Sequence, residues 1–325
     1  MMNSKGLQDF LHIRCGSDLA QPLQKAGLPG AYLAWVDPVC DGPTPEGLTD
    51  DSYRAARARF IADRYGEILA AVLGQLIDQD RALARADDFA EVVIWVEHDL
   101  FDQSILVRLL AWFADHPHRA LTLVQADDFL GRQTPDALTR LFEARRRVTV
   151  SELKLGGYLW ELWCAPDPRP LEALATILDD PARRPEGVSL PHLPAALRRH
   201  LANLPGSRDG LSMTERLALR AVADGAETAG AIFASVCLQE PAAWLGDMMF
   251  YPVLRDLSRA PFALLEQADD RYRLTPIGGA VVMGQMDALQ FGSQPRWIGG
   301  CALESPPQFR WDQQEERVVE GPNLG

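Results

Sequence analysis

The chain of 325 residues is long enough for two compact units, and its 47% of hydrophobic residues suffices to build buried cores. A net charge of −13 argues against a protein that works mainly by neutralising nucleic-acid phosphates or by lying on an anionic membrane. No apolar run approaches the roughly 20 residues of a membrane-spanning helix, and no signal-peptide pattern stands at the start, so we expect a cytoplasmic protein. The five cysteines are widely spaced and form no CxxC pair, so we expect them to be reduced.

Four apolar, strand-like stretches in the first half of the chain alternate with helix-like patterns. The stretches are residues 10–14, 31–36, 92–96 and 121–125. Strands that alternate with helices predict a parallel sheet covered by helices. We therefore expect an α/β fold in which residues 1–148 form an N-terminal domain with a Rossmann-like parallel sheet.

From residue 149 onward the pattern changes to helices without intervening strands. Thr149 and Glu152 have the spacing of a capping box, which predicts the start of the first of these helices. We expect residues 149–205 to form a helical bridge. Residues 206–325 predict three helices, a hairpin from 262–266 and 272–274, and closing strands, which is the order of a winged-helix-like C-terminal domain.

The densest group of polar side chains follows the third predicted strand. Because ligands of open α/β sheets bind at the carboxyl ends of the strands, we expect a site there. Glu97, His98 and Asp102 are its candidate catalytic acid–base residues. Asp99 and Asp102 would bind a metal ion, and Gln103 would bind the ligand. A structural alternative stays open, in which Asp99 is the N-cap of the next helix and Asp102 favours its dipole.

Aspartates also follow the other predicted strands, at the same edge of the sheet. Asp18, Asp37 and Asp127 each stand where a turn or capping residue is common. Together with Gln103 we expect them to be ligand-binding residues that line one crevice. So many carboxylates would repel a bare phosphate, whereas a divalent cation, a cationic substrate or a polyhydroxyl substrate would be accepted. The cofactor is unknown, and a divalent metal is compatible with these residues.

The winged-helix-like segment suggests DNA binding, but its charge does not support that function. Residues 206–325 contain ten Arg, no Lys and sixteen Asp or Glu, which gives a net charge of −6. A protein that reads duplex DNA needs several basic contacts to phosphate. We therefore do not expect a nucleic-acid partner, and a protein partner for this domain is the stronger hypothesis.

Several stretches of the chain are irregular enough to be specific. They are Cys15-Gly16-Ser17-Asp18, Trp35-Val36-Asp37-Pro38 with Gly42-Pro43, Trp95-Val96-Glu97-His98-Asp99-Leu100-Phe101-Asp102-Gln103, Ala196-Leu197-Arg198-Arg199-His200-Leu201, Gly210-Leu211-Ser212 with Thr214-Glu215-Arg216, and Arg296-Trp297-Ile298-Gly299-Gly300. With these stretches the chain resembles a bacterial family catalogued as domain of unknown function 1835. The resemblance covers most of the chain and implies no particular reaction. Gly16-Ser17-Asp18 stands where relatives carry Gly-Asp-Ser or Gly-Asp-Asp, so an essential role for Ser17 is not expected.

Three functions are compatible with the sequence. In the leading one, the strand ends hold a small-molecule site, for instance that of a metal-assisted hydrolase or transferase. In the second, the chain is a ligand-sensing regulator that acts through its winged-helix-like domain. In the third, it is a protein-interaction module whose polar cluster only caps helices and forms buried ion pairs.

Overall fold

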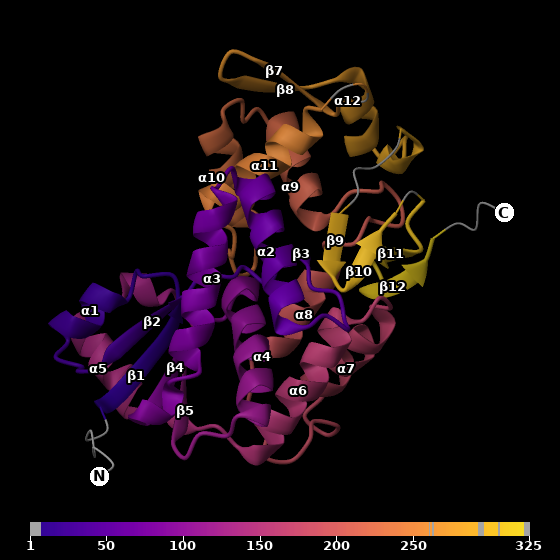
Figure 1. Cartoon of the computed structure of the whole chain (residues 1–325). Helices are drawn as coiled ribbons and strands as arrows, with labels where there is room; N and C mark the ends of the chain where they lie inside the picture. Colours follow the sequence, from indigo (N-terminus) through magenta and orange to yellow (C-terminus); the bar gives the residue numbers. More distant parts are fainter. Residues whose placement is uncertain (1–7, 260, 262, 292–295, 305, 322–325) are drawn as a thin grey trace, which may run out of the picture.

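A five-stranded sheet organises the N-terminal part of the computed structural model, which describes residues 8–259, 261, 263–291, 296–304 and 306–321 (Figure 1). Its strands are β1 (Gln8–Cys15), β2 (Ala31–Trp35), β4 (Phe89–Val96), β5 (Leu121–Gln125) and β6 (Arg146–Arg147). They lie in the order β2-β1-β4-β5-β6; the first four are parallel, and β6 is antiparallel to β5. This arrangement confirms the predicted α/β, Rossmann-like fold. The short antiparallel β6 was not predicted.

Helices cover both faces of this sheet. They are α1 (Ala20–Lys25), α2 (Asp50–Tyr65), α3 (Leu69–Leu83), α4 (Leu100–Asp115) and α5 (Pro135–Glu143), with short 3-10 turns at Ala86–Asp88 and Leu130–Arg132. Alternate residues of β4 belong to two separate apolar cores, since Val93 and Trp95 pack toward α1 and α5. Val92 and Ile94 belong to the larger core that includes α4. Because β4 is buried on both faces, its end holds polar groups in a nearly water-free environment.

The predicted helical bridge packs against the α/β part rather than standing apart from it. It consists of α6 (Val150–Cys164), α7 (Arg169–Asp179) and α8 (Leu193–Leu201). The capping box of Thr149 and Glu152 is present at the start of α6. Gly156 lets α6 approach α4 closely, because a Cβ there would lie 2.3 Å from Cβ of Leu110. Leu159 of α6 therefore shares one hydrophobic core with the sheet.

Residues 206–291 form a helical unit with a separate apolar core. Its elements are α9 (Met213–Ala223), α10 (Ala229–Gln239), α11 (Asp247–Leu257), β7 (Leu265–Ala268), β8 (Arg271–Leu274), α12 (Pro276–Val282) and a 3-10 turn at Ala288–Phe291. Three helices and an antiparallel hairpin thus follow in the expected order; part of the predicted first hairpin strand, residue 262, lies outside the described residues. The winged-helix assignment itself stays a prediction. Among the described helices, none combines the length and the apolar character needed to span a membrane.

The end of the chain returns to the α/β part. Its strands are β9 (Arg296–Gly299), β10 (Cys301–Leu303), β11 (Phe309–Asp312) and β12 (Arg317–Glu320). β9 pairs in parallel with the two-residue strand β3 (Gly42–Pro43), which follows β2 (Figure 1). Phe309 and Trp311 are buried in the core that also contains the sheet. All five cysteines are free, as predicted.

Candidate functional site

The carboxyl ends of β1 and β4 bring oppositely charged side chains together. The two strands are parallel neighbours, and the indole nitrogen of Trp95 donates to Nδ1 of His12 at 3.1 Å across them. Because side chains alternate along a strand, the next residues on the same face are Arg14 and Glu97. Nη2 of Arg14 donates to Oε1 of Glu97 at 2.5 Å.

Three buried carboxylates lie close together beside one guanidinium, and we call this group the acid cluster: Glu97, Asp99 and Asp102 with Arg14. Nη1 of Arg14 donates to Oδ2 of Asp102, and Arg14 also lies 3.5 Å from Asp18. The four members are at most 4% exposed, whereas the side chain of Asp18 is 47% exposed. The acid cluster is therefore buried just beneath a rim that solvent reaches.

Backbone amides anchor all three carboxylates. Oε1 of Glu97 accepts from the amide of Leu130 at 2.6 Å, and Oδ2 of Asp102 accepts from the amide of Glu97 at 2.6 Å. Oδ1 of Asp99 accepts from the amide of Asp102 at 3.1 Å, so Asp99 is the N-cap of α4 as the structural alternative predicted. These bonds account for one oxygen of each carboxylate.

The acid cluster holds more negative than positive charge. It contains three carboxylates and one guanidinium, which pairs with Glu97 and Asp102. A buried charge is stabilised only by close partners, and Asp99 has no cation of its own among the described residues. Burial, followed by the nearby carboxylate of Asp102, raises the pKa of Glu97 to about 7 and the pKa of Asp99 to about 8. At neutral pH the cluster can therefore take up or release a proton, which is a property of general acid–base groups.

The acid cluster also has the composition of a divalent-cation site. Carboxylate oxygens of Glu97, Asp99 and Asp102 lie within 4.8 Å of one another, so they can approach one ion. Oxygen ligands of this kind suit Mg²⁺ or Ca²⁺. Arg14 occupies one oxygen of Glu97 and one of Asp102, so a cation would have to use the remaining oxygens.

The other residues predicted from the strand ends lie around the acid cluster. Nε2 of Gln103 donates to the carbonyl of Glu97 at 2.6 Å, while its buried Oε1 has no partner among the described residues. The half-buried ring of His98 stands beside the ring of His192, at 6.1 Å between centroids. Nε2 of His192 lies 3.0 Å from the carboxylate of exposed Asp127. His98 and Asp127 therefore belong to the rim and not to the acid cluster.

Asp37 follows β2 at the same edge of the sheet, but it has a different set of partners. Its carboxylate accepts from Nε of Arg57 at 2.8 Å and from the hydroxyl of Tyr53 at 3.1 Å. Asp37 is 2% exposed and Arg57 is entirely buried. The role of Asp37 in this structure is thus to hold α2 against the loop after β2.

Sequence reasoning missed Arg14 and His192 as members of this region. A signal for Arg14 was present, because a cation inside an otherwise apolar predicted strand requires an acidic partner. His192 lies in the helical bridge, and no local pattern links it to the strand ends. No model of a known protein family matches the chain, and no curated protein matches it. The resemblance to domain of unknown function 1835 therefore stays a prediction.

Proposed function

We propose that the acid cluster is the centre of a small-molecule site at the strand ends, and that it works together with a divalent cation in a hydrolase or transferase. The observation that carries this proposal is the proximity of three buried carboxylates, only two of which pair with the single guanidinium of Arg14. Such an excess of buried negative charge favours a bound cation or a bound proton. A divalent ion would supply Lewis-acid activation of water or of a substrate oxygen.

Within this proposal, the residues of the chain have different roles. Glu97, Asp99 and Asp102 offer the oxygen ligands, and Arg14 orients two of them. Without a bound ion, Glu97 is instead the candidate proton acceptor, because burial raises its pKa to about 7. Asp18 and His98 lie at the rim, where a polar substrate would enter.

The test is the binding of divalent cations to the purified chain, measured as a rise in the thermal midpoint with MgCl₂, MnCl₂ or CaCl₂. An ion at ~100 times its dissociation constant should add about 2.7 kcal/mol to the free energy of unfolding. Asp102→Asn and Glu97→Gln should abolish the shift. Glu91→Gln is the matched control, because Glu91 lies on the same strand but pairs with Arg145 away from the acid cluster.

Two results would contradict the proposal. The first is the absence of a shift with all three ions and with polar small molecules such as amines and sugars. The second is a shift that Asp102→Asn leaves unchanged. Either result would favour the protein-interaction module, in which the acid cluster only caps α4 and pairs with Arg14.

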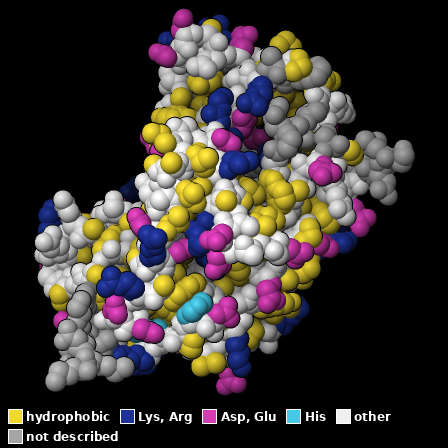
Figure 2. All heavy atoms as spheres, viewed as in Figure 1, with side chains coloured by type: hydrophobic (Ala, Val, Ile, Leu, Met, Phe, Trp, Pro, Cys, Tyr) yellow, Lys and Arg dark blue, Asp and Glu magenta, His cyan; other side chains and the backbone are white. Residues whose placement is uncertain are grey.

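We also infer that the C-terminal helices contact protein rather than nucleic acid. The visible face in Figure 2 mixes acidic and basic side chains without a broad basic patch. Nη2 of Arg255 on α11 donates to the backbone carbonyl of Arg64, and Arg271 forms an ion pair with Glu227. Both arginine side chains are more than half exposed, but their partners within the chain compete with phosphate for them. The cytoplasmic location stays a prediction.

A further inference from the structure

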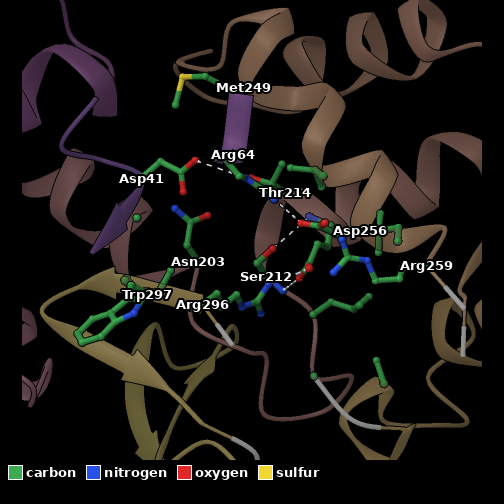
Figure 3. A pocket seen from close by; sticks show the side chains of 18 of the residues that line it. Asp41, Arg64, Asn203, Ser212, Thr214, Met249, Asp256, Arg259, Arg296 and Trp297 are labelled. Atoms are coloured by element: carbon green, nitrogen blue, oxygen red, sulfur yellow. Dashed lines mark hydrogen bonds and ion pairs between the residues drawn. The ribbon is translucent and has the colours of Figure 1, made fainter. Parts of the chain in front are cut away.

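A cavity of about 420 Å³ lies where three parts of the chain meet (Figure 3). Its walls come from α2 with the loop at β3, from α9 and α11, and from β9. The volume falls within the range of small-molecule sites, about 300–1,000 Å³. No member of the acid cluster lines this cavity, so it is a separate candidate site.

Five of the six charged side chains that described residues contribute to the wall lie in ion pairs with one another, and the sixth, Arg259, is not free either. Arg64 of α2 forms an ion pair with Asp256 of α11 and lies 4.0 Å from Asp41. Nη1 of Arg296 lies 2.8 Å from Oε1 of Glu215. A charged ligand would have to separate one of these ion pairs or leave its own charge without a partner. Either costs binding free energy in a site that is shielded from water. The wall therefore favours an occupant without net charge.

Asn203 supplies a hydrogen-bond donor that the chain itself does not use. Its side chain is nine-tenths buried, and its Oδ1 accepts from Nη1 of Arg199 at 2.8 Å. No described residue accepts a hydrogen bond from its amide nitrogen. In Figure 3 this amide lies in the cavity between Asp41 and Trp297. This nitrogen is not one of the fully buried atoms without a partner, so solvent in the cavity reaches it. An occupant that displaces this solvent has to offer an acceptor in its place.

The remaining wall is largely apolar and rich in rings. Its aromatic residues are Phe60 of α2, Trp297 of β9, and Trp244 from the loop before α11. Helix α11 adds the flexible Met249 and the aliphatic Val253. Aromatic walls are best matched by flat rings, through stacked or edge-to-face contacts. Methionine adapts to the shape of such a ring.

We propose that this cavity binds an uncharged aromatic or heteroaromatic small molecule that carries a carbonyl oxygen or a ring nitrogen as hydrogen-bond acceptor. The acceptor receives the amide of Asn203, and the ring lies against the apolar wall. Because the walls come from three parts of the chain, the bound molecule contacts all of them at once. This site goes beyond the proposed function of the strand ends and does not depend on it.

The experiment measures binding of defined probes by ligand-observed NMR and titration calorimetry on the full chain. Nicotinamide and indole-3-carboxamide are the uncharged aromatic probes. Indole-3-acetate, tryptamine and cyclohexanecarboxamide are the comparison compounds, which differ in charge or in aromatic character. We expect the first two to bind and the other three to bind at least about tenfold more weakly, a difference of about 1.4 kcal/mol.

Four variants test whether the binding takes place in the cavity. Met249→Trp fills the cavity and should remove binding, whereas Met248→Trp on the same helix is 55% exposed, lies outside the lining, and should change the dissociation constant less than about twofold. Asn203→Asp keeps the oxygen that Arg199 contacts but loses the amide donor, and should weaken binding about tenfold. Asp102→Asn should leave probe binding intact, which separates this site from the acid cluster.

The proposal is overturned if neither aromatic amide binds the wild-type chain up to its solubility limit. It is also overturned if the charged probes bind as tightly, or if Met249→Trp binds with the wild-type dissociation constant. Should Met249→Trp fail to fold, Asn203→Asp decides the question, because it is isosteric and leaves the cavity open.

Discussion

Replacing Arg14 by methionine tests whether the acid cluster is held together by one buried cation. Methionine retains much of the unbranched aliphatic stem but lacks the guanidinium that contacts Glu97 and Asp102. Both carboxylates are nearly inaccessible, so they would be left as unpaired buried charges. Loss of one partner from a buried ion pair costs about 3–5 kcal/mol, and we expect the free energy of unfolding at pH 8 to fall by about that amount.

The size of this loss should depend on pH in a defined direction. The pKa of Glu97 is raised to about 7, mainly by burial, and Arg14 opposes that rise. A carboxyl group whose pKa is higher in the folded than in the unfolded chain stabilises the fold at low pH and loses that contribution as the pH rises through the folded value. Without Arg14 the folded pKa rises further, so the difference between wild type and variant should shrink as the pH falls from 8 to 5.

The assay is urea unfolding followed by circular dichroism at pH 8, 6.5 and 5, with a chelator present. Arg85→Met is the control, because Arg85 is exposed and pairs with Asp88 at the surface, where an ion pair contributes about 0–1 kcal/mol. A loss below about 1 kcal/mol for Arg14→Met at pH 8 would refute the assignment of Arg14 as the cluster's counter-ion. A loss that is the same at all three pH values would refute the electrostatic explanation.

Two further changes test the packing and the buried histidine. Gly156→Ala should lower the free energy of unfolding by about 1–3 kcal/mol in thermal melts, because the new Cβ would lie 2.3 Å from Cβ of Leu110. The control is Gly157→Ala, whose new Cβ would lie 3.9 Å from its nearest neighbour. This control should be neutral or stabilising. Burial lowers the pKa of His200 to about 3, so its neutral form favours the fold above pH 6.5 and about 2 kcal/mol is lost between pH 7 and 5. His200→Phe should flatten that dependence in urea unfolding, and an unchanged slope would contradict it.

Local signals predicted most of the elements because each lies within a few residues of the structure it determines. The capping box at Thr149 and the apolar run before Glu97 are such signals, and both lie where predicted. Strand β6 has only two residues, and its existence depends on pairing with β5 rather than on its own pattern. Helix α5 begins at Pro135 after a capping Thr134, a signal that was present in the sequence and was not used.

The composition of the candidate site could be predicted only in part, since its partners are distant in the sequence. Arg14 and Glu97 meet because β1 lies beside β4, and the local sequence of neither strand predicts that they are neighbours. Asp37 was expected in the crevice, yet Arg57, one of several arginines on α2, holds its carboxylate. Choosing between such pairings requires three-dimensional positions, because every carboxylate at the sheet edge has a similar local sequence.

The position of Arg57 bears on whether the two candidate sites can influence each other. Its guanidinium donates to Asp37 and to the backbone carbonyls of Pro38, Asp41 and Pro43, and so it fixes the loop between the sheet edge and the cavity. A signal passing along this loop needs two alternative arrangements of it. A second arrangement would separate Arg57 from a buried partner, at a cost of about 3–5 kcal/mol. The structure therefore favours two sites that bind independently over a ligand-sensing regulator that signals through this loop.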